Sequence, residues 1–207
     1  MLYDSNEELI RSIELSGVLK TPRIIEAFEK IDRKYFVPSS YADYRYIDRP
    51  LPIGRDQTIS QPSTVAFMLE LLLPEEGSKV LDIGSGSGWT AALLCAIVGE
   101  KGSVLGLERV DDLVERGQNN LKQFDFKQCK IRKADEKLGL PGETFDRILV
   151  SASADEIPRE LFAQLKIGGI LVIPVRNSIY HFKKISEIEI ETEEYQGFVF
   201  VPLIYEK

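Results

Sequence analysis

Three glycines that follow a short apolar segment form the most informative stretch of this 207-residue chain. Residues 80–89 read V-L-D-I-G-S-G-S-G-W, which predicts a buried strand that turns through glycines into a helix. Such a turn lets a ligand approach backbone N–H groups at the N-terminus of a helix. The dinucleotide fingerprint G-x-G-x-x-G would require glycine at position 89, which is Trp89. A diphosphate is therefore the less favoured ligand.

Two acidic residues extend this candidate site. Glu108 ends the next apolar segment, about 20 residues after Gly88, where an acidic side chain can accept hydrogen bonds from both hydroxyls of a ribose. Asp135 follows the third apolar segment and could accept from the exocyclic amine of an adenine. Each feature alone has a structural explanation, as a tight turn, a solvated charge or a helix cap. Together they predict an adenosine-bearing ligand without a diphosphate, which points to S-adenosylmethionine.

Alternating apolar segments and amphipathic helices must position these residues. The alternation is typical of a parallel sheet covered on both faces. Val110, Leu113, Val114 and Leu121 share one face of a predicted helix, and residues 158–165 predict a shorter one. Two further segments without a helix between them, 180–191 and 198–204, predict an antiparallel pair. The five predicted parallel strands are 79–83, 103–108, 128–132, 145–151 and 169–175.

Helices and a loop precede the sheet. Ser5 and Glu8 form a capping box for a first helix, Thr21 and Pro22 begin a second, and Pro62 begins a third. Residues 38–62 are rich in tyrosine and proline without a sustained period, which predicts a long ordered loop.

We therefore predict an α/β fold with a doubly wound, mostly parallel sheet of about seven strands, a C-terminal antiparallel pair and an N-terminal helical extension. The predicted organisation is a single domain over 1–207. In it, 1–62 forms the N-terminal helices and a loop that covers the site, 63–175 the cofactor-binding core and 176–207 the antiparallel strands.

Composition disfavours several other classes. With 43% hydrophobic and 29% charged residues the chain is typical of a globular protein. A net charge of −7 argues against a nucleic-acid partner. One histidine and two cysteines cannot form a four-ligand zinc site or a disulfide framework, so no metal is predicted. We expect Cys95 and Cys129 to be buried structural thiols and His181 to have a structural or surface role.

The location of the protein is predicted from its apolar segments. The N-terminus lacks the basic start and the apolar run of a signal peptide. The longest apolar segment, 90–99, is about half the length of a membrane span. We expect a cytoplasmic monomer with no membrane partner.

Several segments outside the glycine turn resemble the protein-L-isoaspartate O-methyltransferase family of class I methyltransferases, whose fold is Rossmann-like. The resemblance runs from about residue 20 to the end, and the Q-T-I-S of residues 57–60 is specific to this family. The chain departs from the family pattern at Asp56, Ala134 and Glu136, where the family commonly has glycine, and at 151–155. The matching segments are 33–38 (R-K-Y-F-V-P), 52–62 (P-I-G-R-D-Q-T-I-S-Q-P), 145–152, 156–175 and 200–203 (F-V-P-L).

The resemblance implies methyl transfer from S-adenosylmethionine to the free α-carboxyl of L-isoaspartyl residues in damaged peptides and proteins. S-adenosyl-L-homocysteine is the product, and the ester then closes to a succinimide that opens partly to normal aspartate. It also implies that Ser60 is the catalytic residue, which orients the carboxylate. The residues alone leave open that Ser60 is the N-cap of the helix that begins at Pro62.

The resulting site predictions form two sets. Predicted cofactor-binding residues are Thr58, Asp82, Gly84, Ser85, Gly86, Ser87, Gly88, Glu108, Arg109 and Asp135. Predicted substrate-binding residues are Ile59, Ser60, Ser151, Val201 and Leu203.

The implied chemistry suits a chain with one histidine. A carboxylate with a pKa of about 4 is already ionised at neutral pH, so no general base is required. Two alternatives remain: another S-adenosylmethionine-dependent methyltransferase that acts on RNA or a small carboxylic acid, and a non-catalytic binder of the cofactor or of isoaspartyl peptide. The acidic pI of about 5.0 disfavours RNA. We also expect a positive or hydrogen-bonding group near Ser60 to offset Asp56, with Arg55 the nearest candidate.

Overall fold

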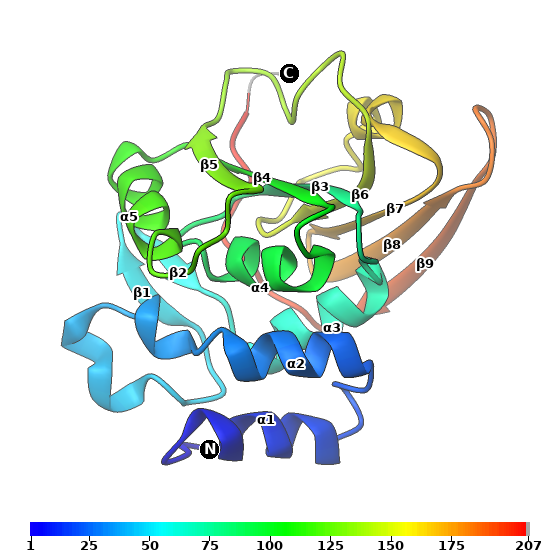
Figure 1. Ribbon diagram of the computed structural model, residues 1–207. Coiled ribbons are helices and arrows are strands. Elements are labelled where there is room, and N and C mark those ends of the chain that lie inside the picture. Colours follow the sequence, from blue (N-terminus) through cyan, green and yellow to red (C-terminus); the bar gives the residue numbers. More distant parts are fainter. Residues whose placement is uncertain (206–207) are drawn as a thin grey trace.

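A seven-stranded sheet forms the centre of the computed structural model, which describes residues 1–205 (Figure 1). Its strand order is β5-β4-β3-β6-β7-β8-β9. The first five strands in this order pair in parallel, and β8 and β9 add an antiparallel pair at one edge. The strands are β3 (Lys79–Ile83), β4 (Ser103–Glu108), β5 (Cys129–Lys133), β6 (Phe145–Val150), β7 (Leu165–Val175), β8 (Ser178–Lys184) and β9 (Ile190–Gln196).

The central strands are apolar because both faces of the sheet are covered. Val80 and Leu149 belong to the apolar cluster on the helical face, whereas Leu81 and Ile148 belong to the cluster on the opposite face. All four side chains are buried. The predicted parallel sheet and its antiparallel addition are therefore confirmed, with the predicted bounds at β3 and β4.

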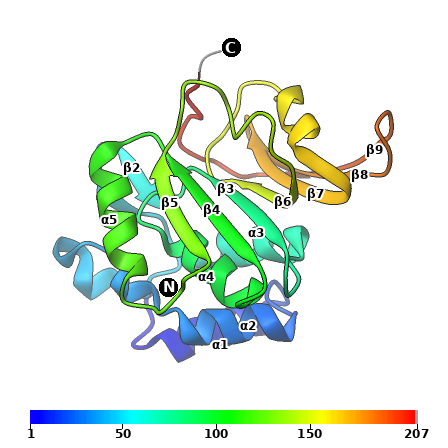
Figure 2. The same ribbon diagram turned by 45° about the horizontal axis from the view of Figure 1, so that its top comes forward.

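Helices are stacked in layers on one face of the sheet. Figure 1 shows α1 outermost, then α2, then α4 against the strands, and α3 and α5 flank α4 on the same face (Figure 2). The opposite face is covered by the short 3₁₀ helix η3 (Arg159–Gln164) and by loops. The helices are α1 (Asn6–Leu15), α2 (Pro22–Lys30), α3 (Pro62–Leu72), α4 (Trp89–Val98) and α5 (Asp111–Leu121).

The predicted loop over residues 38–62 is wrong in part. It contains an antiparallel hairpin, β1 (Leu51–Gly54) and β2 (Gln57–Ile59), preceded by the 3₁₀ helices η1 (Arg33–Tyr35) and η2 (Ser39–Tyr44). The hairpin turns at Arg55 and Asp56, whose φ angles are 54° and 56°. Hairpins with positive φ usually have Asn or Gly at these positions, so the sequence lacked the usual turn residues.

The two predicted C-terminal strands are also wrong in their bounds. Residues 180–191 span the end of β8, a turn and the start of β9, because Ile185 N and Ser186 N donate to Glu189 O and reverse the chain. Residues 198–204 form no strand and make only an isolated bridge from Pro202 to Ser153. The strand β9 was missed because most of its side chains are exposed and polar, three of them glutamates, as expected of an edge.

Cys95 and Cys129 are joined by a disulfide, which corrects the prediction of two separate thiols. Cys95 lies in α4 and Cys129 begins β5, and their Cα atoms are 6.1 Å apart because α4 packs beside that strand. Such proximity depends on tertiary packing. A sequence separation of 34 gave no indication of it.

Candidate functional site

The glycine turn lies where β3 ends and α4 begins. Gly84, Gly86 and Gly88 have φ angles of 82°, 53° and 88°, a region that side chains with a Cβ rarely adopt. A Cβ on Gly88 would also meet Gly117 of α5 at 3.2 Å. The turn therefore depends on glycine both for its backbone path and for the close approach of α5.

The carboxylate of Glu108 is fixed against this turn. Glu108 ends β4 and is 5% exposed, and its two oxygens accept from Gly86 N and Val110 N at 2.9 Å each. A carboxylate oxygen with one N–H partner still has a free acceptor position. Glu108 is thus oriented in advance for a ligand with two adjacent hydroxyls.

Asp82 lies behind the turn in an unusual state. It is fully buried, and neither of its carboxylate oxygens has a hydrogen-bond partner among the described residues. Burial, with a smaller contribution from the nearby charge of Glu108, raises the pKa of Asp82 to about 7. The buried Ser85 hydroxyl likewise has no partner in residues 1–205. Unpaired buried polar groups are costly, so Asp82 and Ser85 form an unsatisfied polar cluster beneath the turn.

A pocket opens over the turn at the C-terminal ends of β3, β4 and β6. It brings together most of the predicted site residues, which are Thr58, Gly84, Gly86, Glu108, Arg109, Asp135, Ser151, Val201 and Leu203. Asp82, Ser85, Ser87, Gly88 and Ile59 do not line it; the first four lie within or behind the turn, and Ile59 is packed in the apolar core. Asp135 is largely exposed and makes a 3.8 Å ion pair with Arg132.

Sequence reasoning missed about half of the pocket lining. Leu107 could have been found, since it precedes Glu108 on a strand that ends at the site. The loop after β5 contributes Ala134 and residues 137–139, and it has no motif that would have indicated a wall. The remaining missed residues are Gln57, Ile83, Ala152, Pro202, Ile204 and Tyr205.

Ser60 lies in a second hollow that adjoins the first. Thr58, Ser151 and Val201 line both hollows, so the two adjoin at these residues. The second hollow is otherwise lined by Pro50, Ser60, Gln61, Thr64 and residues 197–200. Residues 197–205 return from β9 across the strand ends, as the red segment in Figure 2 shows. There Ser153 N donates to Val201 O and Leu203 N donates to Ser153 O, at 2.8 Å each.

The alternative role of Ser60 as a helix cap is wrong. The N-cap position of α3 is Gln61, and no side chain caps the helix from that position. Instead the carboxylate of Asp48 accepts from Ser63 N at 2.9 Å in the first turn. The Ser60 hydroxyl is therefore not engaged in capping.

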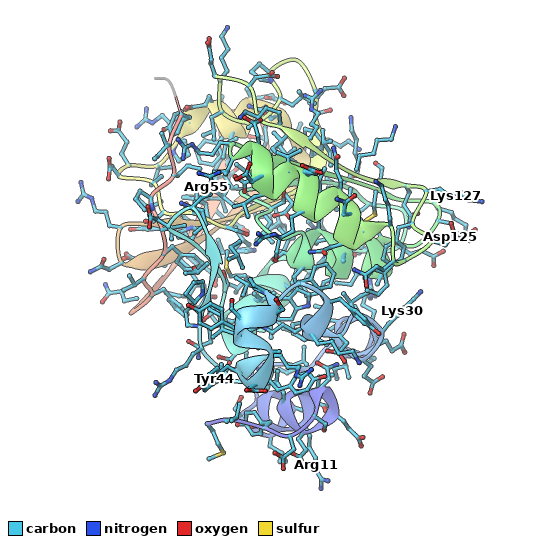
Figure 3. The ribbon with its side chains drawn as sticks, turned by 90° about the vertical axis from the view of Figure 1, so that its left-hand side faces the viewer. Arg11, Lys30, Tyr44, Arg55, Asp125 and Lys127 are labelled. Carbon is cyan, nitrogen blue, oxygen red and sulfur yellow. A yellow bond between two sulfur atoms is a disulfide. The ribbon has the colours of Figure 1, made fainter. Side chains whose placement is uncertain are left out.

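The β1–β2 hairpin is attached to α5 beside the pocket. Arg55 forms an ion pair with Asp112, including a bond from Nε of 2.7 Å, and Arg116 donates to the Ile53 carbonyl. Figure 3 shows Arg55 next to α5. Arg55 is thus engaged with α5, and the expectation that it supplies positive charge at Ser60 is wrong. The hairpin instead places Gln57 and Thr58 in the pocket wall.

Neither a helix suited to crossing a bilayer nor a group of three metal-ligating side chains occurs in residues 1–205.

Comparison with known proteins identifies the family. The family model for protein-L-isoaspartate(D-aspartate) O-methyltransferase matches residues 4–207. A protein-L-isoaspartate O-methyltransferase of Methanopyrus kandleri is 41% identical over 209 residues, which cover 98% of this chain and 92% of that one. One of Pyrococcus horikoshii is 39% identical over 212 residues, covering 99% of this chain and 95% of that one.

Solved structures support the same family assignment. A Plasmodium falciparum protein described as a protein-L-isoaspartate O-methyltransferase, in complex with S-adenosyl-L-homocysteine, superposes with a TM-score of 0.87 at 25% identity. That match covers 99% of this chain and 100% of that one. The family model spans almost the whole sequence and close relatives cover nearly all of it, so the chain belongs to the protein-L-isoaspartate O-methyltransferase family.

Proposed function

We propose that this protein transfers the methyl group of S-adenosylmethionine to the α-carboxyl of L-isoaspartyl residues in damaged peptides and proteins, and so begins their repair. One observation carries the proposal. In a chain of this family, a pocket over a glycine turn shares Thr58, Ser151 and Val201 with an adjoining hollow that holds Ser60. A methyl donor in the first and a carboxylate in the second would meet at this junction.

The residues of the first pocket fit S-adenosylmethionine. Glu108 has two acceptor positions for the ribose hydroxyls, and Asp135 lies at the rim for the adenine amine. Asp82 lies behind the turn and outside the pocket lining, so its ionised form would act on the positively charged end of the cofactor only through space. Gly84 and Gly86 let the ligand come close to the backbone, and Arg109 and Thr58 complete the walls.

When bound, the cofactor supplies a methyl group on a sulfonium: a carboxylate oxygen forms the new C–O bond, and the sulfur keeps the electrons of the broken C–S bond. No proton moves in this step, so the chain has only to bind, align and exclude water. Ser60 donates a hydrogen bond that orients the attacking oxygen. Ser151, Val201 and Leu203 hold the extended peptide beside it, and Ile59 anchors the end of β2, which carries Thr58 and leads directly into Ser60.

The setting of the reaction is part of the proposal. We take the protein to act as a single-domain monomer in the cytoplasm, on peptide and protein substrates and without nucleic-acid or membrane partners. Its net charge of −7 disfavours a polyanionic partner.

A pair of peptides tests the proposed function. They have the same sequence and differ only in whether one residue is L-isoaspartyl or L-aspartyl. The wild-type protein with labelled S-adenosylmethionine should methylate the first and leave the second unlabelled. Equal labelling of the two peptides, or labelling of neither, would overturn the proposal, and labelling of RNA alone would favour the alternative methyltransferase.

A further inference from the structure

Arg33 is a buried cation that none of the roles described above uses. It lies in η1, its side chain is 0% exposed, and it is the largest fully buried side chain among the described residues. It makes no ion pair with any side chain in residues 1–205. Burial lowers the pKa of Arg33 to about 10, so the guanidinium remains charged at neutral pH.

The guanidinium is bound by backbone carbonyls of one region of the chain. Nη1 donates to Arg45 O at 3.1 Å and to Ile47 O at 2.8 Å. Nη2 donates to Arg49 O at 2.9 Å and to Ser60 O at 3.1 Å. Arg33 thus joins the segment that precedes the β1–β2 hairpin, residues 45–49, to Ser60, which directly follows the hairpin.

The other neighbour of Arg33 is the helix that follows the glycine turn. Its Cζ lies 5.5 Å from the centre of the Trp89 ring, a cation–π distance. Trp89 is the first residue of α4, directly after Gly88, and its Nε1 donates to Ile31 O at 3.3 Å. One side chain therefore contacts both the helix that carries the cofactor turn and the backbone of Ser60.

The chemistry of this contact favours arginine. A buried charge that forms no ion pair is costly even with the carboxylate of Asp48 near enough to favour it, and an apolar side chain of similar volume is often as stable or more so. A planar guanidinium directs its N–H groups in a fixed fan, whereas an ammonium is a point charge with three donors. Only a guanidinium can donate to carbonyls from both Nη atoms while its planar face lies over the indole ring of Trp89.

We propose that Arg33 is a positioning residue for methyl transfer: by holding the Ser60 carbonyl against the helix that begins at Trp89, it sets where the Ser60 hydroxyl lies relative to the methyl donor. This inference rests on the function proposed above. Arg33 lines neither hollow, so it acts through Ser60 and not by touching cofactor or substrate. Misplacement of reacting groups by about 1 Å can cost about 100-fold in rate.

A double-mutant cycle tests the inference. Arg33→Lys, Ser60→Ala and the double variant are assayed for kcat on the isoaspartyl peptide and for the Kd of S-adenosylhomocysteine. We expect Arg33→Lys alone to lower kcat about 10- to 100-fold with the Kd within about threefold of wild type. In the Ser60→Ala background the same change should lower kcat by less than about threefold, because no hydroxyl remains to be positioned.

A merely structural role would give a different result. Arg33→Lys would then lower kcat by the same factor in both backgrounds, or leave it unchanged, and either outcome overturns the inference. Arg33→Met, which keeps much of the volume and has no donor, should behave like Arg33→Lys and serves if the lysine variant does not fold.

Arg147→Lys is the matched control. Arg147 is a partly buried arginine that donates to the backbone carbonyls of Leu73 and Asp146, and it lines neither hollow. The Arg147→Lys variant should be less stable than the wild type, with an unchanged kcat.

Absence of transfer by the wild type would refute the proposed function and the inference together, whereas an active wild type without coupling between Arg33 and Ser60 refutes the inference alone.

Discussion

Replacing Glu108 by glutamine tests the proposed ribose contact with a change of one atom. In the wild type each carboxylate oxygen accepts one backbone N–H, from Gly86 and from Val110, at 2.9 Å. An amide has one oxygen and one NH₂ group, so in either orientation a donor faces one of these N–H groups. The variant loses one backbone hydrogen bond, one acceptor for the cofactor and the negative charge.

The size of the effect follows from which bonds depend on the cofactor. The backbone bond is lost with and without ligand, so it mainly weakens the turn. The lost acceptor affects affinity directly, and a hydrogen bond to a charged group contributes about 1.5–3 kcal/mol. We therefore expect the Kd for S-adenosylhomocysteine to rise about 10- to 150-fold in Glu108→Gln.

Isothermal titration calorimetry tests the predicted rise in Kd with two ligands, of which the first is S-adenosylhomocysteine. The second ligand is the 2′,3′-dideoxy analogue of S-adenosylhomocysteine, for which the penalty of Glu108→Gln should nearly vanish because there are no hydroxyls to accept from. Glu143→Gln is the control, since this carboxylate pairs with Lys79 on the exposed surface and lies outside both hollows. An unchanged Kd in Glu108→Gln, or an equal penalty for both ligands, would refute the ribose contact.

Three other predictions concern separate features. The pKa of Asp82 is raised from about 4 in the unfolded chain to about 7 in the fold, so between these pH values the native state binds more protons than the unfolded state. The free energy of unfolding should therefore fall as pH rises from 4 to 7. Asp82→Asn should flatten this dependence in urea unfolding at several pH values; an unchanged slope would contradict it. Ser60→Ala should lower kcat about 10-fold or more with cofactor affinity unchanged, and a collapse of affinity in calorimetry would point to a structural role. Removing the Cys95–Cys129 disulfide, which closes a separation of 34 residues, should lower the free energy of unfolding by about 2–4 kcal/mol. This is measured with and without reductant, and an unaffected Cys95→Ala/Cys129→Ala variant would show that the bridge does not stabilise the fold.

The core of the fold could be predicted because its strands are buried on both faces. A short buried strand such as β3, with Val80, Leu81 and Ile83 interrupted only by Asp82 and followed by glycines, has few other interpretations. The position of Glu108 followed from the same reasoning, since strands in parallel register end at one edge of the sheet. These are features for which local sequence and tertiary environment require the same residues.

The parts that were missed depend on contacts between distant segments. The edge strand β9 has an exposed, charged composition, and the hairpin turn at Arg55 and Asp56 adopts positive φ without glycine. Arg33 resembles a surface residue in sequence, and only the fold shows that four carbonyls surround it. Each of these features is determined by the surroundings that the fold assembles around the residue.

The uncharged lining of the Ser60 hollow also has a chemical reason. In the described part of the chain, the residues that line it carry no charge, while Arg55 pairs with Asp112 and Arg33 donates to backbone carbonyls, that of Ser60 among them. Methyl transfer from a sulfonium to a carboxylate removes both charges as it proceeds. A fixed cation at the carboxylate would stabilise the charged ground state more than the partly neutralised transition state, and so would raise the barrier. In the role proposed for it, the neutral Ser60 hydroxyl would orient the oxygen with less of this penalty. Of the positive or hydrogen-bonding group expected near Ser60, the hydrogen-bonding kind therefore suits the chemistry better.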